Sequence, residues 1–379
     1  MTVDPIARLV QLAMGYALAV RPGDVLVISG PRVAEPLVYR LFGAALGLGA
    51  LPVIRYRGDL YRETTLCTAG DDAERWVNPL GVPEGRPVAR SVGIWAMEEA
   101  GPAAHALLGE CAPAGAAGPS APALRSHPEE HARQREFLQA AAAGKLRWLA
   151  LFYPTPAAAR IAGMAPDAFE QLIFAADMLD ELNPPAAWRA LFERQERLCQ
   201  RLGRARTIRF TTPRGTDLTM RIGGRKWINS GGHRNLPDGE VFTAPVEGSV
   251  TGVFSGDLPV LHEDQVIDGV RLEFDGGRLV RAFAERGDDA LQRLIAQDPG
   301  AARVGEVAIG LNPRLAVGTK MSLLDEKIGG TFHIALGAAY PETGGSNDSL
   351  VHRDFVADLC QGGRIELDGR VFSEDGALV

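Results

Sequence analysis

Two histidines and a nearby aspartate in the last part of the chain have the types and the spacing of metal ligands. His352 and Asp354 are separated by one residue in NDSLVHRD, and His333 begins the strand-like run HIALG. Since alternate side chains of an extended segment point the same way, His352 and Asp354 would face one cation together. A mixture of imidazole and carboxylate groups suits zinc, cobalt, manganese or iron, whereas magnesium and calcium prefer oxygen alone. A core histidine bonded to an aspartate would explain the same short pattern.

Two carboxylates in apolar surroundings favour the metal interpretation. Glu240 lies in NLPDGEVFTAP and Glu306 lies in VGEVAIG, and both segments are largely apolar and strand-like. Burying a lone ionised carboxylate costs several kcal/mol unless a cation or several hydrogen-bond donors compensate it. Neither position has an adjacent lysine or arginine. We therefore expect both carboxylates to need a cation or a set of donors.

The elements that must position these residues are mostly strands. From Arg206 the hydrophobic period changes from helical to alternating, and the next residues predict a hairpin with a turn at 213–216. Further strands are expected over residues 246–254, 270–274, 279–284, 304–309 and 332–336, with one helix over 288–297. The second half is therefore predicted to be β-rich.

The first half alternates helices with short apolar runs. Residues 5–20 and 36–48 have helical spacing, while residues 25–29 and 52–56 are typical of buried strands, without a phosphate-binding glycine loop. A strand over 148–153 and helices over 166–182 and 187–203 follow. We therefore predict an α/β N-terminal domain over residues 1–205 and an α+β, β-rich C-terminal domain over residues 206–379.

Composition excludes several classes of protein. Forty basic and 47 acidic residues give a net charge of -7, and no basic block occurs, so neither nucleic acid nor an anionic membrane is expected as the main partner. The widely spaced Cys67, Cys111, Cys199 and Cys360 predict reduced thiols. The start of the chain has no signal-peptide pattern, and no long apolar run follows, which predicts a cytoplasmic protein.

The segments quoted above, together with DEKIGGTFHIALGAAY, resemble the aminopeptidase T / aminopeptidase S family of two-metal metallopeptidases. The order and the separations of these segments match the family, and RPGDVLVISGP is similar to part of its N-terminal domain. The resemblance implies that the C-terminal domain is catalytic. It places the family's metal ligands at Glu240, Glu306, Glu326, His333, His352 and Asp354, and its motif tyrosine at Tyr340.

This chain departs from the better-known members at one point. It has Asp325-Glu326-Lys327 where they have Asp-Glu-Asn, and they reach the histidine in two fewer residues. The insert at residues 328–331 could move Glu326 relative to the cations. In that case Glu326 would still serve as a base, with Lys327 as its ion-pair partner.

The resemblance implies a cocatalytic pair of divalent ions, zinc, cobalt or manganese, with magnesium as an alternative. Two such ions bind a substrate's free α-amino group, polarise the scissile carbonyl and activate water. Glu306 or Glu326 would accept the proton of that water, and Tyr340 would hydrogen-bond the oxyanion. The expected substrates are peptides with a free N-terminus, and the expected assembly is a homodimer.

Two competing hypotheses remain. In the first, the chain is a mononuclear iron(II) dioxygenase that opens hydroxylated pyridine rings, with His333, His352 and Asp354 as a facial triad. Glu240 and Glu306 favour the peptidase, because a single iron would not need them. In the second, the fold binds metal without turnover, which a displaced Glu326 would favour.

Overall fold

The computed structural model describes residues 4–56, 87–97, 137, 139–262 and 265–378. Contacts divide the chain into two compact units, residues 1–160 and residues 161–379. The predicted boundary near residue 205 falls inside the second unit, and the two predicted domains remain a prediction. The loop expected at Ala112–Pro122 and the histidines at 105, 127 and 131 lie outside the described residues.

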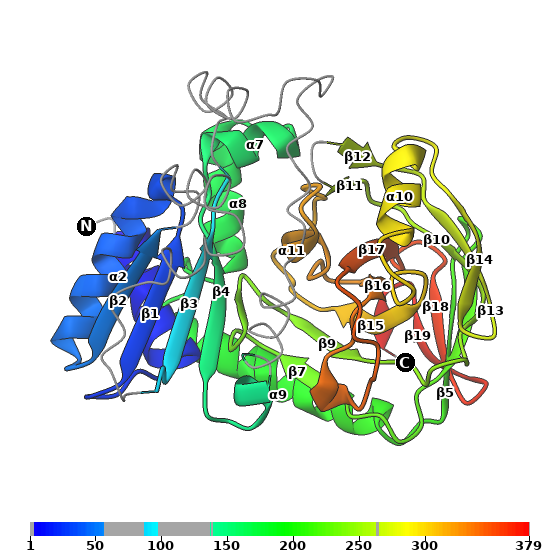
Figure 1. Ribbon diagram of the computed structural model, residues 1–379, viewed down its shortest axis with the longest axis horizontal. Helices are drawn as coiled ribbons and strands as arrows, with labels where there is room; N and C mark the ends of the chain where they lie inside the picture. Colours follow the sequence, from blue (N-terminus) through cyan, green and yellow to red (C-terminus); the bar gives the residue numbers. More distant parts are fainter. Residues whose placement is uncertain (1–3, 57–86, 98–136, 138, 263–264, 379) are drawn as a thin grey trace, which may run out of the picture. The chain divides into compact units, whose positions relative to one another are not determined.

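The first unit is built on a parallel sheet with strand order β2-β1-β3-β4 (Figure 1). Val25 of β1 pairs with Leu51 of β2, and helix α2 connects these two strands, as the predicted βαβ unit requires. Strands β1 and β4 are largely buried, which explains their nearly continuous apolar runs. The elements are α1 (Pro5–Gln11), the π-helical turn η1 (Leu12–Ala17), β1 (Val25–Gly30), η2 (Arg32–Ala34), α2 (Glu35–Gly47), β2 (Leu51–Tyr56), β3 (Arg90–Trp95), β4 (Arg147–Phe152) and α7 (Pro156–Ala162), which crosses the unit boundary.

The second unit begins with helices and continues as strands. Its helices are α8 (Pro166–Ala176), α9 (Pro184–Leu202), α10 (Asp288–Ile295) and α11 (Ser322–Asp325), with a 3-10 turn η4 (Pro341–Thr343). Its strands are β5 (Thr207–Thr211), β6 (Asp217–Arg221), β7 (Ile228–Ser230), β8 (Asn235–Leu236), β9 (Glu240–Thr243), β10 (Thr251–Ser255), β11 (Val260–His262), β12 (Gln265–Ile267), β13 (Arg271–Asp275), β14 (Arg278–Phe283), β15 (Val304–Gly310), β16 (Thr331–Gly337), β17 (His352–Asp358), β18 (Arg364–Leu367), β19 (Arg370–Glu374) and β20 (Ala377–Leu378).

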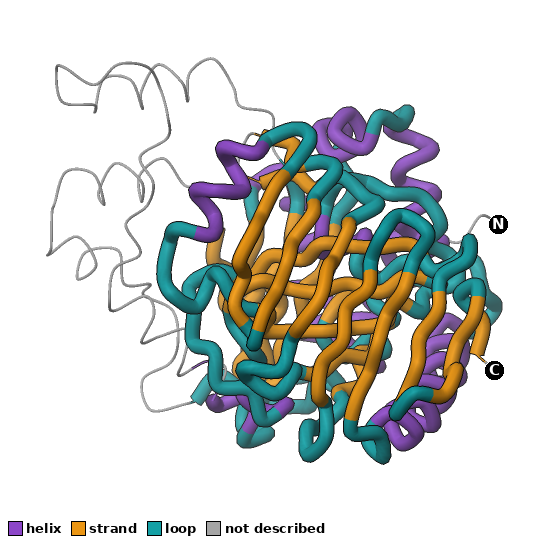
Figure 2. Tube along the Cα trace, turned by 90° about the vertical axis from the view of Figure 1, so that its right-hand side faces the viewer, coloured by secondary structure: helices purple, strands orange, loops and turns teal. Residues whose placement is uncertain are grey.

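Two antiparallel sheets pack against each other in this unit. The larger has the order β14-β13-β10-β6-β5-β18-β19-β20 and faces the viewer in Figure 2; the smaller has the order β17-β16-β15-β9-β7. Phe332 of the smaller sheet joins them, because its ring stacks on Phe210 at 4.1 Å and meets Phe254 edge-on at 5.7 Å. Apolar residues of both sheets belong to one buried cluster, so the smaller sheet has one face in the core.

The expected combination of a parallel α/β region and a β-rich region is confirmed. Two elements begin or end more than three residues from the predicted bounds. The helix expected to reach residue 182 ends at Ala176, since Met178 has a left-handed backbone (φ 57°). The strand expected from residue 246 begins at Thr251, because Val246 and Ser249 form a turn. No helix among the described residues is long and apolar enough to cross a bilayer.

Candidate metal centre

Strand alternation places the strand-borne candidate ligands on one face of the smaller sheet. Ala335 of β16 pairs with Glu306 of β15 on one side and with Asp354 of β17 on the other. Residues two apart in a strand share a face, so His333 and His352 lie on this face as well. Glu240 reaches the same face from β9, where it pairs with Gly310 at the end of β15. The ligand face defined here carries Glu240, Glu306, His333, His352 and Asp354.

A β-bulge in β15 gives Glu306 its direction. The register shifts between Val304, which pairs with Leu336, and Glu306, which pairs with Ala335. Val304 and Val307 are three residues apart and would face opposite sides of a regular strand, yet both are in the core. The extra residue restores the alternation, so Glu306 points to the ligand face. Only glycine fits at 305, because a Cβ there would lie 2.1 Å from the Gly337 carbonyl oxygen.

Glu326 comes to the same cluster from the end of helix α11, as the residue that follows Asp325. The insert at 328–331 forms a tight turn, in which Gly330 has φ 82° and donates its N–H to the Gly310 carbonyl at 3.2 Å. This bond anchors the insert on the end of β15. Glu326 remains within a few ångströms of His333 and Asp354, so the insert leaves it in the cluster.

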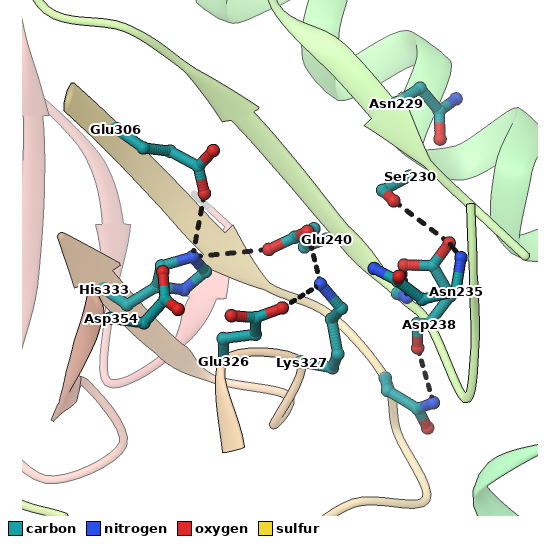
Figure 3. A network of polar contacts seen from close by, with 12 residues as sticks. Asn229, Ser230, Asn235, Asp238, Glu240, Glu306, Glu326, Lys327, His333 and Asp354 are labelled. Carbon is teal, nitrogen blue, oxygen red and sulfur yellow. Dashed lines mark hydrogen bonds and ion pairs between the residues drawn. The ribbon is translucent and has the colours of Figure 1, made fainter. Parts of the chain in front are cut away.

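The six candidate ligands form overlapping groups. Figure 3 shows Glu240, Glu306, Glu326, His333 and Asp354 pointing toward one another. In each group the possible ligand atoms lie within 4.8 Å of one another. The groups found among the described residues are Glu240, Glu306 and His333; Glu306, His352 and Asp354; and Glu326, His333 and Asp354. Glu306 is common to the first two groups, His333 to the first and third, and Asp354 to the second and third. A carboxylate common to two groups, Glu306 or Asp354, is the arrangement expected of a ligand shared by two cations.

Several ligand atoms are buried and have no hydrogen-bond partner among the residues that the structure describes. They are Glu240 Oε2, Glu306 Oε2, His333 Nδ1 and Asp354 Oδ1. Glu240 and Glu306 are each 4% exposed, and His333 is fully buried. A buried carboxylate oxygen without a partner costs several kcal/mol. Divalent cations would satisfy these oxygens, so the residues present fit a metal centre.

The two histidines are held in ways that suit this use. His333 Nε2 lies 3.3 Å from Glu240 Oε2 and 3.4 Å from Glu306 Oε1. Burial alone would lower the pKa of His333, but the hydrogen bond to Glu306 and the charge of Glu240 raise it to about 9. His352 donates from Nδ1 to the Ala338 carbonyl at 2.9 Å, which leaves Nε2 directed toward Asp354, 3.6 Å away. Such a bond fixes the tautomer of a metal-binding imidazole.

Lys327 makes a second ion pair that the sequence did not predict. Its ammonium lies 2.5 Å from Glu326 Oε1, as expected, and also 2.5 Å from Glu240 Oε1. Burial alone would lower the pKa of Lys327, but the two carboxylates raise it well above its ordinary value. Burial raises the pKa of Glu240 in spite of the ammonium. The second pair joins residues 87 positions apart in the chain, so no local pattern indicates it.

Tyr340 lies beside the ligand face. Its ring is 5.3 Å from that of Phe242 and 5.6 Å, edge-on, from that of His352. Burial and the nearby Glu306 raise its pKa, so the hydroxyl stays protonated and able to donate. The remaining described histidines are elsewhere: His233 meets the Phe192 ring, and His262 ends β11.

Comparisons with known proteins give one family and two solved structures of the same fold. The family model described as thermophilic metalloprotease (M29) matches residues 3–361. Aminopeptidase 2 of Geobacillus stearothermophilus is 29% identical over 400 residues, which cover 92% of this chain and 91% of that protein. Aminopeptidase T of Thermus aquaticus is 34% identical over 240 residues, covering 55% of this chain and 56% of that protein. The chain thus matches about half the length of that relative.

Two solved structures share the fold. Wild-type AmpT from Thermus thermophilus has a TM-score of 0.74 and 24% identity, with 99% of each chain covered. The 2,5-dihydroxypyridine dioxygenase from Pseudomonas putida has a TM-score of 0.56 and 15% identity, with 100% of this chain and 98% of that one covered. At these identities the likeness concerns the fold and leaves the chemistry to the residues of the site.

Proposed function

Because this chain belongs to the thermophilic metalloprotease family (M29), we propose that it is a metal-dependent aminopeptidase that releases N-terminal residues from peptides. The observation that carries the proposal is the pair of ligand groups that share Glu306. The relatives named aminopeptidase T and aminopeptidase 2 support the same reaction class. Zinc, cobalt or manganese suits this mixture of imidazole and carboxylate ligands.

In this proposal the ligand face holds two divalent ions. Glu240, Glu306 and His333 would bind one ion, and Glu306, His352 and Asp354 the other. Bound there, the ions would supply Lewis-acid activation of the scissile carbonyl and of the attacking water. In this assignment Glu306 is the shared ligand. Glu326, which also forms a group with His333 and Asp354, is the residue that accepts a proton.

Two side chains complete the chemistry. Glu326 Oε1 is held by Lys327, so its other carboxylate oxygen is the one available to take a proton from water. The Tyr340 hydroxyl would donate a hydrogen bond to the oxyanion that forms at the substrate carbonyl. A free α-amino group would be recognised by the anionic cluster, which restricts the enzyme to N-terminal residues. The predicted homodimer and the predicted cytoplasmic location remain predictions.

The alternative, a ring-cleaving iron(II) dioxygenase, has one structural point in its favour, the shared fold. Its triad would be His333, His352 and Asp354. However, each ligand group of the described residues contains a glutamate, and a mononuclear iron site needs neither Glu240 nor Glu306. The peptidase accounts for these buried carboxylates, whereas the dioxygenase leaves them without a role.

The decisive experiment is metal analysis of the protein reconstituted separately with Zn²⁺, Co²⁺, Mn²⁺ and anaerobic Fe²⁺. The proposal expects two equivalents of zinc, cobalt or manganese and release of N-terminal residues from leucyl and arginyl peptides. The Glu306→Ala variant should lose peptidase activity and at least one equivalent, while Glu374→Ala, an exposed residue paired with Arg364, keeps both. One tightly held iron in the wild type, or full activity with both metals in Glu306→Ala, would contradict the proposal.

A further inference from the structure

The Lys327 ammonium is buried within the ligand cluster. Only 1% of its side chain is exposed, and the side chains of its partners Glu240 and Glu326 are 5% and 11% exposed. An ammonium has three N–H donors. Glu240 and Glu326 accept two of them, and the Asn235 amide, turned with its oxygen toward Lys327, accepts the third at 3.1 Å. The cation is therefore fully bonded before any metal is present.

We propose that Lys327 is a built-in cation of the metal centre: it holds one oxygen each of Glu240 and Glu326, keeps the metal-free cluster folded, and weakens the binding of divalent ions. This inference rests on the proposed function, because it takes Glu240 to be a metal ligand. The cluster contains four carboxylates, those of Glu240, Glu306, Glu326 and Asp354, within a few ångströms. Without a cation their mutual repulsion opposes folding. The ammonium offsets part of that charge.

Lys327 has two opposite effects on metal affinity. It holds the Glu240 side chain in place, which favours binding, and its positive charge repels a divalent ion, which is the larger effect. Loss of the ammonium would free the Glu240 side chain, but the backbone of β9 stays fixed. It pairs with β15 and β7, and Gln195 donates to the Glu240 carbonyl at 3.0 Å. The repulsion between an ammonium and a divalent ion in a buried site is large, since low dielectric strengthens it. Removing Lys327 should therefore tighten metal binding.

The choice of lysine suits this position. Most basic residues of the chain are arginines, and lysine occurs only at 145, 226, 320 and 327. A guanidinium is planar and broad, whereas an ammonium is a compact point charge that can sit between two carboxylates and an amide. In Figure 3 the ammonium lies between Glu240 and Glu326, on the side of Glu240 away from His333. Glu240 Oε2 is thus left for the metal while Oε1 is taken.

The test compares Lys327→Met with the wild type by thermal unfolding and by Co²⁺ titration calorimetry. The metal-free variant should unfold roughly 6–20 °C lower, because a buried ion pair loses one partner. Its Co²⁺-induced rise in Tm should exceed that of the wild type, with a Kd about tenfold lower. Lys320→Met is the matched control, since among the described residues Lys320 Nζ bonds only to the Ile161 carbonyl. This substitution should lower the Tm equally with and without Co²⁺.

A second variant separates the effect of the Lys327 charge on Co²⁺ binding from the effect of its side-chain packing. Glu326→Gln combined with Lys327→Met removes one charge of each sign, so its Co²⁺ affinity should return to within about threefold of the wild type. It also serves if Lys327→Met does not fold. An unchanged Co²⁺ increment in Lys327→Met, or a double variant that binds Co²⁺ tenfold more weakly, overturns the inference. A wild type whose Tm does not respond to Zn²⁺, Co²⁺ or Mn²⁺ contradicts the proposed function instead.

Discussion

Tyr340 shows how one side chain is prepared for chemistry by its neighbours. Its ring is enclosed by Phe242 and His352, so the hydroxyl has a limited range of positions. His352 is itself fixed by its bond to the Ala338 carbonyl. A donor that is already oriented need not reorganise when charge develops on the substrate, and such donors lower barriers by several kcal/mol.

We expect Tyr340→Phe to lower kcat by roughly 100-fold while KM changes much less, because the lost hydrogen bond forms mainly in the transition state. Steady-state kinetics with a leucyl peptide substrate measures both constants. Phe242→Leu, on the same side of the sheet, controls for a change in ring packing without loss of a hydroxyl. A Tyr340→Phe enzyme with unchanged kcat would show that the tyrosine is structural.

Among the elements of the site, strand β15 leaves the least space for a side chain, at Gly305. Its bulge at Gly305 turns Glu306 to the ligand face while Val304 and Val307 stay in the core. The bulge brings the backbone of β15 so close to β16 and the residue after it that a methyl group at 305 would meet two carbonyl oxygens, at 2.1 Å and 2.4 Å. Neither oxygen belongs to a flexible side chain, so the backbone would have to move.

We predict that Gly305→Ala destabilises the protein by roughly 1–3 kcal/mol, because strand β15 must shift to relieve the overlap. The shift moves Glu306, so binding of divalent ions should weaken as well. Thermal unfolding with and without Co²⁺ measures both effects. Gly43→Ala is the control: it lies in α2 with open space around it and should stabilise by about 0.5–1 kcal/mol. A Gly305→Ala protein that keeps the wild-type Tm would exclude a tight bulge.

Periodicity was sufficient for the long elements and insufficient for the short ones. The apolar stripe of α9 and the alternation of β5 and β6 predicted these elements correctly, because each has enough residues to show its period. The hairpin of β18 and β19 was missed, although Asp368-Gly369 at its turn is a recognisable signal. Strand β7 has three residues and gives no period at all.

Only part of the site could be predicted from sequence patterns alone. His352 and Asp354 follow from strand alternation. Glu326 stands out in the sequence only as an acidic residue seven positions before His333, and its role as a ligand, like that of Tyr340 in catalysis, was identified through the family resemblance. The contact of Lys327 with Glu240 depends on how β9 pairs with β15 and on the fold of the insert after α11. Local sequence contains neither fact. Long-range pairing therefore accounts for most of what the sequence alone did not predict.

At the scale of the whole molecule, Asp298 connects segments that are far apart in the chain. It accepts hydrogen bonds from Gly300 and Ala301 beside it, and from Ser349 and Leu350 just before β17. These bonds hold the loop from which the strand with His352 begins. Burial alone would raise the pKa of Asp298, but the four donors lower it.

A lowered pKa makes the contribution of Asp298 to stability depend on pH. The ionised carboxylate is favoured in the folded state, so the contribution is complete above its unfolded pKa and disappears as pH falls through the folded pKa. We expect Asp298→Asn to cost about 1–2 kcal/mol at pH 7 and progressively less below pH ~4. Thermal unfolding across this range tests it, with the exposed Asp275→Asn as the control for charge. A cost that stays constant down to pH ~2 would contradict this origin.

In the smaller sheet, the position of a residue along its strand decides whether its side chain faces the core or the metal ligands. This alternation limits where the chain can gain or lose residues. Inserting one residue into β16 ahead of Phe332 and His333 would exchange the faces, so that phenylalanine entered the site and histidine the core. Substitutions of single residues do not change this alternation. Additions are tolerated only between strands, and residues 328–330 of the insert lie there, in the turn that ends where β16 begins at Thr331. Relatives of this chain should therefore differ in loop length at such turns and keep the lengths of β15, β16 and β17.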